Sequence, residues 1–208
     1  MKNEDRSRKV RSDKKRDIKP TIPVQLYECI NRISYVTNTP IKDVGELICR
    51  KGLYSAVVIE HLSNYFRRDY WATNHSMYIG NLKQSPYIIP KGIPKQRITM
   101  RFSQTDHDRL ARLAYSLDLT VSSATGLLLE SSVKNTDIVN AFISNYVKKE
   151  LDTNRIKQLR EVLKFINKNN PYQEEITVGA FISMLMDEVK ETTFTMTESI
   201  KRWLDDQQ

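Results

Sequence analysis

The chain has few of the residues and patterns that mark metal-dependent or nucleotide-hydrolysing enzymes. Its three histidines, His61, His75 and His107, lie far apart and form no H-x-H or H-E-x-x-H pattern, so a metal-dependent nickase or protease is not expected. No G-x-x-x-x-G-K-[ST] phosphate loop is present, which argues against an ATPase. We expect histidines at the surface or on helix flanks, and a protein that is not an enzyme and has no cofactor.

Cysteine is scarce, and long apolar runs are missing. The two cysteines, Cys29 and Cys49, both fall in segments with helical periodicity, which indicates reduced thiols in a core. No stretch has the length and apolar character of a membrane span or a secretory signal. These absences predict a soluble, cytoplasmic protein with no membrane partner.

Positive charge is concentrated at the N-terminus. Residues 1–16 contain eight basic and three acidic side chains, and so carry +5 of the net charge of +8. This arm has no apolar periodicity, and we expect it to be disordered until it binds a partner. A basic arm ahead of a nearly neutral body indicates a polyanionic partner; the alternative is a tail that only keeps the chain soluble.

A block of sequence occurs twice, at residues 17–69 and 97–150. Residues 62–69 match residues 143–150 position by position in residue or type, and further upstream the two blocks are offset by 80 residues. Each block begins with a short alternating segment and continues with three segments of helical periodicity. An alternating strand with two short helices cannot bury its own apolar face, so each block is expected to pair with the other.

The periodicity also predicts where the helices and connections lie. Residues 70–96 are interpreted as a linker, because three prolines and Gly92 exclude a long regular element. Residues 151–208 are interpreted as a separate helical segment, whose apolar stripe at Phe181, Met184, Leu185 and Val189 is typical of a core or an oligomer face. The expected helices are 23–36, 41–52, 54–68, 104–117, 121–134, 137–149, 155–168, 177–191 and 196–206.

The second alternating segment has two chemically different faces. Ile98, Met100 and Phe102 fall on one face and need helices to cover them. The opposite face carries Arg97, Thr99 and Arg101, whose guanidinium groups and hydroxyl suit the edges of guanine and other bases in a DNA major groove. The alternative is an ordinary edge strand with solvated arginines.

The order of strand, helix and second helix at residues 17–52 and 97–134 resembles the ribbon-helix-helix fold of the Arc and methionine repressor class. The resemblance implies a mainly α fold with a short antiparallel β-ribbon, built from two tandem ribbon-helix-helix units and followed by the C-terminal helical segment. In that family the ribbon enters the major groove, and the N-terminus of the second helix holds a phosphate. By position, the resemblance implies base contacts at Arg97, Thr99, Arg101, Lys19 and Thr21, and phosphate contacts at Thr120, Val121, Ser122, Ile41 and Lys42.

Three features depart from the family pattern. Pro20 lies in the first alternating segment and lacks an N–H to donate. Asp17, in the same segment, would repel phosphate if it faced the groove. Asn38 and Asp118 replace the glycine that is common between the two helices, although both residue types tolerate left-handed backbone. The first copy is therefore expected to read DNA differently from the second, or to serve mainly as its structural partner.

The expected function is sequence-specific binding of double-stranded DNA, as a transcriptional repressor or regulator on bacterial nucleoid or plasmid DNA. The alternative is an architectural adaptor, such as a relaxosome accessory protein of a conjugative plasmid or a partition protein, with a partner such as a relaxase. Simple repressors of this fold are often short chains with a single unit. Here each unit has an extra helix, and the C-terminal segment could make homo-oligomers, so the sequence favours the adaptor alternative more than usual. An antitoxin is a third possibility.

We expect the two strands to form one ribbon within a single chain. The 27 residues from 70 to 96 could span up to about 90 Å when extended, and tethering gives the partner strand an effective concentration of about 1 mM. A strand pair of unequal partners could also place Pro20 where no hydrogen bond is required. The competing arrangement is a homodimer in which each strand pairs with its own twin.

Overall fold

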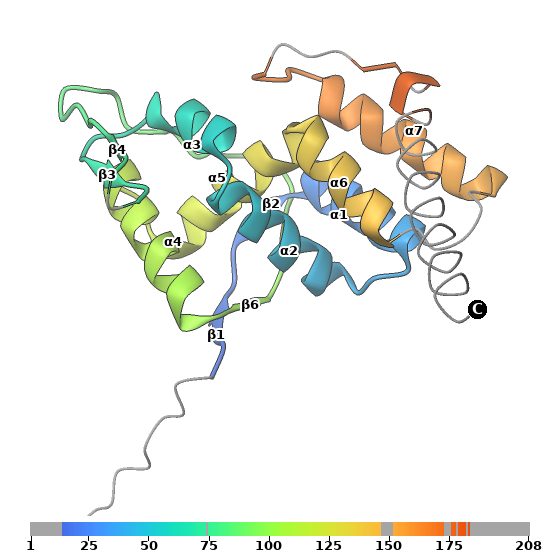
Figure 1. Cartoon of the computed structure of the whole chain (residues 1–208), viewed down its shortest axis with the longest axis horizontal. Helices are drawn as coiled ribbons and strands as arrows, with labels where there is room; N and C mark the ends of the chain where they lie inside the picture. Colours follow the sequence, from blue (N-terminus) through green and yellow to red (C-terminus); the bar gives the residue numbers. More distant parts are fainter. Residues whose placement is uncertain are drawn as a thin grey trace, which may run out of the picture.

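The computed structural model describes residues 14–73, 75–146, 152–172, 176–177, 179–181 and 183, and this part of the chain is mainly helical with short antiparallel strand pairs (Figure 1). In chain order the elements are β1 (Arg16–Ile18), β2 (Thr21–Pro23), α1 (Val24–Thr37), α2 (Ile41–Leu53), α3 (Ala56–Ser63), β3 (Tyr70–Trp71), β4 (Met77–Tyr78), β5 (Lys95–Arg97), β6 (Met100–Phe102), α4 (Gln104–Leu117), α5 (Val121–Lys134), α6 (Thr136–Tyr146) and α7 (Thr153–Asn167).

Each sequence block forms two short strands followed by three helices. β1 and β2 lead into α1, α2 and α3, and β5 and β6 lead into α4, α5 and α6. The main departure from the predicted bounds is α3, which ends at Ser63 instead of residue 68. The backbone N–H groups of Arg67 and Arg68 donate to the carbonyl of Ser116 in α4, at 2.8 and 3.2 Å, and so cannot continue the helix.

In the described residues of the connection between the blocks, 70–73 and 75–96, there is one short strand pair and no long element, as its prolines predict. β3 and β4 pair antiparallel, with Tyr70 opposite Tyr78. Tyr70 is fully buried, and the ring of Tyr87 lies edge-on to that of Tyr65 at 5.3 Å between centroids. Tyr70 and Tyr87 of this connection therefore pack against the body of the protein, whereas Trp71 is exposed.

The two alternating segments pair with each other within the chain. β1 pairs antiparallel with β6, and β2 pairs antiparallel with β5, with Thr21 opposite Arg97. The two pairs share one register, because between them the N–H of Ile98 donates to the carbonyl of Pro20 at 3.1 Å. The structure thus has the expected intramolecular ribbon, in which segments 80 residues apart in sequence lie side by side.

Pro20 occupies a hydrogen-bonding position of this ribbon. In an antiparallel ladder the bond from Ile98 to Pro20 would be returned by an N–H at position 20, which proline does not have. The expectation that strand pairing would place Pro20 where no bond is required is therefore wrong. The ladder is interrupted at this point, and the buried Pro20 ring lies so near α5 that a Cβ on Gly126 would be 3.6 Å from it.

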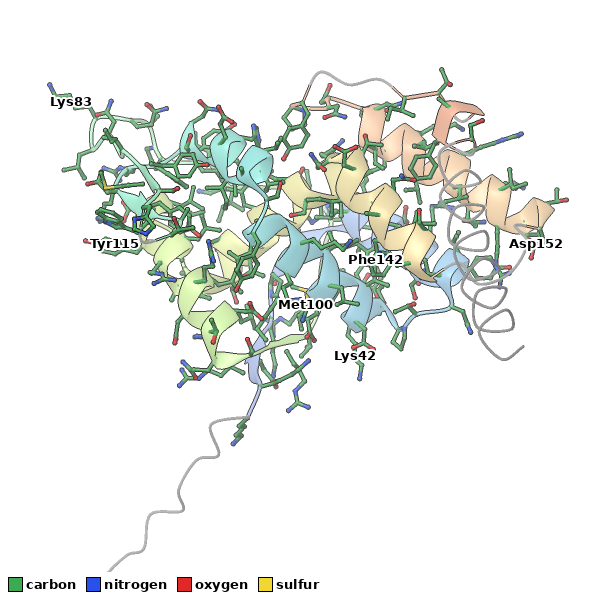
Figure 2. The ribbon with its side chains drawn as sticks, in the orientation of Figure 1. Lys42, Lys83, Met100, Tyr115, Phe142 and Asp152 are labelled. Carbon is green, nitrogen blue, oxygen red and sulfur yellow. The ribbon has the colours of Figure 1, made fainter. Side chains whose placement is uncertain are left out.

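The apolar face of the ribbon is covered by helices from both blocks. Ile18, Ile22, Ile98, Met100 and Phe102 are all buried. α2 packs against β6 and α5 packs against β2, so the second helix of each block covers a strand of the other. Figure 2 shows Met100 beside α2. The core is therefore shared between the blocks, and neither block buries its strand alone.

The two helix–helix turns use the left-handed backbone that the sequence indicated. Asn38 ends α1 with φ 52°, and Asp118 ends α4 with φ 57°. Asp118 also accepts from Arg67 and Arg68, at 2.5 and 2.8 Å. Asparagine and aspartate tolerate this conformation better than other non-glycine residues, so the absence of glycine does not prevent the turn.

The C-terminal part of the chain is not a segment of its own, as far as the structure describes it. α7 packs against α1, with Leu159, Val162, Leu163 and Ile166 in the common core. Lys134 at the end of α5 donates to the carbonyls of Phe165 and Lys168 at the end of α7. The expectation of a separate segment at 151–208 is corrected for α7. Phe181 is buried, while the rest of the predicted stripe and the predicted helix at 196–206 lie outside the described residues.

Both cysteines are free and buried, as predicted, and burial raises the pKa of the Cys29 thiol to about 12. No helix in the described part of the chain combines the length and apolar character needed to cross a membrane.

Candidate nucleic-acid interface

One face of the ribbon is exposed and polar. The side chains that alternate with the buried ones are those predicted as base contacts, and all five are exposed: Lys19, Thr21, Arg97, Thr99 and Arg101. Asp17 completes the face at the start of the first strand and is also exposed. The alternation of the two segments thus brings the predicted base-contact residues of both blocks onto one surface.

The exposed face is organised around its midpoint. Thr21 lies opposite Arg97 and Asp17 lies opposite Arg101, so the common register places Lys19 opposite Thr99 between them. Lys19 and Thr99 are also equivalent positions of the two sequence blocks, which are offset by 80 residues. The ribbon therefore has an approximate twofold relation centred on these residues, as two similar strands require when they pair.

An ion pair crosses the ribbon at one end. The carboxylate of Asp17 accepts from Nε of Arg101 at 2.9 Å, and both side chains are largely exposed. At the other end, Arg97 faces the hydroxyl-bearing Thr21 instead of an acid. The sequence showed Asp17 as an isolated acid near a candidate phosphate surface; only the strand register could show that it pairs with Arg101.

The N-terminus of α5 has backbone donors available. The hydroxyl oxygen of Thr120 accepts from the N–H of Ser123 at 3.1 Å and caps the helix. The first N–H groups of a helix have no acceptor within it, which leaves those of Val121 and Ser122 to bind an external acceptor. An anion there would also meet the positive end of the helix dipole.

The N-terminus of α2 is equivalent in position but different in chemistry. Pro40 precedes it without a side-chain cap, and its carbonyl accepts from Asp43 and Val44 at 2.8 and 3.0 Å. The N–H groups of Ile41 and Lys42 have no acceptor within the helix. Lys42 is exposed and extends outward from the start of α2 (Figure 2), and its ammonium group adds a positive charge that the N-terminus of α5 lacks.

A groove joins the ribbon face to the start of α5. Its walls include Lys19, Thr21 and Arg97 from the ribbon and Ser122 and Ser123 from α5. Predicted base-contact and phosphate-contact residues therefore converge on one concave surface. Sequence spacing alone could not show this convergence, because it depends on the packing of α5 against the strand of the other block.

Several residues around the groove were missed by the sequence analysis. Tyr87, Ile89 and Pro90 of the inter-block connection form part of its wall, and so does Glu130 of α5. Burial raises the pKa of the Glu130 carboxyl group, while the nearby Lys134 opposes that shift. Nothing in the sequence indicated that Glu130 would lie beside a candidate anion-binding surface. The sequence showed only that Glu130 and Lys134 are one helical turn apart and can therefore interact.

The C-terminal end of the basic arm lies beside α2. Lys15 donates to the carboxylate of Glu46 at 2.6 Å, and the chain then enters β1 at Arg16. The predicted arm of residues 1–16 therefore contributes its last residue to the ribbon, and residues 1–13 lie outside the described part of the chain.

The histidines are separated in the structure. His61 lies in α3 with its ring edge-on to those of Tyr65 and Tyr172, at 6.0 and 5.4 Å between centroids, and burial lowers its pKa. His75 lies in the β3–β4 turn and His107 in α4. Within the described ranges, no group of three His, Cys, Asp or Glu side chains could hold a metal ion.

Comparison of the chain with protein-family models, with curated proteins and with solved structures gave no match.

Proposed function

We propose that this chain binds double-stranded DNA by placing the ribbon in the major groove, and that its two blocks act as tandem ribbon-helix-helix units folded into one pseudo-dimer. The observation that carries the proposal is the ribbon itself. Its buried side chains are apolar, the exposed side chains that alternate with them from 17 to 21 and from 97 to 101 are all polar, and the start of α5 adjoins these exposed side chains in one groove. A two-stranded ribbon fits the width of the major groove.

The chemistry of the exposed face supports DNA over other polyanions. Arg97 and Arg101 present guanidinium groups that can bond to guanine O6 and N7, and Lys19 and Thr99 can donate to base edges between them. The N–H groups at the starts of α2 and α5 would bind the phosphates on either side. The phosphate contacts would fix the register, and the ribbon would then read the sequence.

Within this proposal, a transcriptional repressor or regulator remains the first role. An adaptor role is the second candidate, and one observation favours it. Trp71 and Met77 face each other across the β3–β4 pair and are 53% and 42% exposed. Apolar side chains presented together in this way are suited to a protein partner. Figure 1 places this pair away from β1 and β6, so a protein partner could bind there while the ribbon lies in the major groove of DNA.

A binding assay with matched charge variants tests the proposal. The affinity of the full chain for a labelled mixed-sequence duplex is measured by fluorescence anisotropy across a salt series. The variant Lys19→Ala/Arg97→Ala/Arg101→Ala should lose at least about tenfold in affinity, because it removes three groups from the reading face. Lys157→Ala/Arg160→Ala/Lys164→Ala removes three exposed charges from α7 and should lose much less. Equal losses in the two variants would reject the ribbon as the DNA-binding surface.

A further inference from the structure

The two halves of the exposed ribbon face are chemically unequal. On one side of the midpoint Thr21 faces Arg97, and on the other side Asp17 faces Arg101. In the sequence repeat, Asp17 is equivalent to Arg97 and Thr21 to Arg101. A homodimer of either strand would carry the same pair of residues at both ends. In this ribbon, one end has the acidic Asp17 where the other end has the basic Arg97.

The Asp17–Arg101 pair presents a donor and an acceptor side by side. Arg101 uses Nε for the 2.9 Å bond, which leaves its two terminal nitrogens free to donate outward. The carboxylate keeps its second oxygen as an acceptor. Among the residues that the structure describes, no carboxylate pairs with Arg97, so this combination occurs at one end of the ribbon.

This donor–acceptor combination fits the major-groove edge of a G·C pair better than that of an A·T pair. Adenine also presents an amino group, but it lies between single acceptors, whereas guanine offers the guanidinium two adjacent acceptors. A G·C pair presents O6 and N7 of guanine as acceptors and the N4 amino group of cytosine as a donor. Arg101 can donate to guanine while Asp17 accepts from the cytosine of the same pair. Thymine O4, guanine O6 and N7 and the phosphates are all acceptors, so the Asp17 carboxylate repels DNA that does not place an amino group beside it.

We propose that Asp17 and Arg101 form a specificity-determining pair that selects a G·C base pair, and that one chain therefore recognises an asymmetric duplex site. The second half of the site is read by Arg97 with Thr21, without an acid. This inference rests on the proposed DNA-binding function and adds the class of DNA that is recognised. Asp17 contributes discrimination at the expense of affinity, because it lowers the charge of the reading face.

The flanks of the ribbon differ as well, which supports an asymmetric site. The start of α2 carries the exposed Lys42, and the equivalent position of α5 is Ser122. The groove on the α5 side includes Glu130, whereas the equivalent position on α2 is the exposed Arg50. Phosphates on the two sides of the ribbon would therefore meet different charges.

Selection from random duplexes tests the inference with the full chain. Wild type, Asp17→Asn and Glu60→Gln are each used to enrich sequences from a duplex library. Each duplex has about 20 random base pairs, or roughly two helical turns of DNA. The Glu60→Gln variant removes one exposed acid from α3 and serves as the matched charge control. Affinities for the enriched sites and for single-position changes are then measured.

Wild type should enrich a non-palindromic site with a G·C pair at one position of one half. Asp17→Asn should lose about tenfold of the discrimination at that position and bind unrelated duplexes more tightly, while Glu60→Gln should match wild type. Arg101→Lys, which keeps the charge but not the planar fork, should also reduce the discrimination at that position. Arg97→Ala should affect only the other half.

The outcomes separate this inference from the proposed function. A palindromic enriched site, or unchanged discrimination in Asp17→Asn, would overturn the inference and leave DNA binding in place. If wild type enriches no sequence, the proposed sequence-specific function itself fails.

Discussion

Gly52 and Ser132 are equivalent positions of the two sequence blocks, and they meet where α2 crosses α5. A Cβ atom on Gly52 would lie 1.8 Å from Oγ and 2.9 Å from Cβ of Ser132. The Ser132 hydroxyl donates to the carbonyl of Leu128 at 2.6 Å and is fully buried. The two central helices therefore approach as closely as they do because one of the two positions has no side chain.

Replacing Gly52 with Ala should destabilise the chain. The added methyl group forces α2 and α5 apart, and overpacking of this kind typically costs about 1–3 kcal/mol, which outweighs the roughly 1 kcal/mol gain in helix propensity. Chemical denaturation measures the free energy of unfolding. Gly126→Ala is the control, because its Cβ would make ordinary contacts of 3.5 and 3.6 Å.

The exchange variant Gly52→Ser/Ser132→Gly offers a stricter check of the same crossing. It swaps the two equivalent side chains and keeps the total volume at the contact. We expect it to be clearly more stable than Gly52→Ser alone. If the exchange restores nothing, the two positions are not coupled across the helix crossing.

Glu130 should make stability depend on pH. Burial raises the pKa of its carboxyl group, so the folded chain holds this proton at pH values where the unfolded chain has released it. The free energy of unfolding therefore falls as the pH rises from the ordinary carboxyl value through the raised one. Glu130→Gln should match wild type below about pH 4 and be more stable above this window, as thermal unfolding at several pH values would show.

Glu161 provides a control of opposite sign. A hydrogen bond from Lys164 lowers the pKa of this exposed carboxyl group, so its contribution is present at neutral pH and is lost on acidification. Glu161→Gln should be slightly less stable than wild type at neutral pH, with the difference closing as the pH falls. Parallel pH profiles for the Glu130 and Glu161 variants would contradict the assigned environments.

Lys134 should hold α7 against the core. Its ammonium group donates to the carbonyls of Phe165 and Lys168 and lies 4.4 Å from the ring centroid of Phe165. Lys134→Met keeps an apolar side chain but removes both bonds, each worth roughly 1.5–3 kcal/mol for a charged donor. Hydrogen exchange should show loss of protection in α7 first. Lys164→Met, on the exposed side of α7, should leave this protection unchanged.

The basic arm should add affinity for DNA without sequence preference. Deleting residues 1–13 should flatten the slope of log K against log salt by about 0.9 for each phosphate that the arm neutralises in the wild-type complex, while the order of preference among duplexes stays the same. An arm with the same residues in shuffled order should behave as wild type, because the effect depends on charge. An unchanged slope after deletion would leave the arm as a solubility tail.

Much of the fold could be predicted from the sequence because it depends on local patterns. Strict alternation at 97–102 defined both faces of the ribbon, and the period of the apolar residues located six helices of the two blocks. Asn38 and Asp118 stand where the resembled family commonly has glycine, and the tolerance of both residue types for left-handed backbone was noted from the sequence; both adopt that backbone. These features are set by side-chain spacing and backbone preference, which a single sequence records.

The parts that could not be predicted depend on contacts between distant segments. The ion pair between Asp17 and Arg101 follows from the strand register, and α7 packs against α1 and accepts hydrogen bonds from a lysine in α5. The effect of Pro20 was misjudged because hydrogen-bonding and non-hydrogen-bonding positions alternate along a ladder. Which set contains Pro20 is fixed only when the partner strand is in place.

Site-specific crosslinking tests most directly whether the ribbon contacts DNA. The native cysteines are 2% and 0% exposed, so a photoreactive thiol reagent would label an introduced surface cysteine selectively. Thr99→Cys places the label at the ribbon midpoint, and Glu60→Cys places it on the exposed side of α3 as the control. We predict strong crosslinks to duplex DNA from position 99 and few from position 60. DNA binding without crosslinks from position 99 would contradict the account.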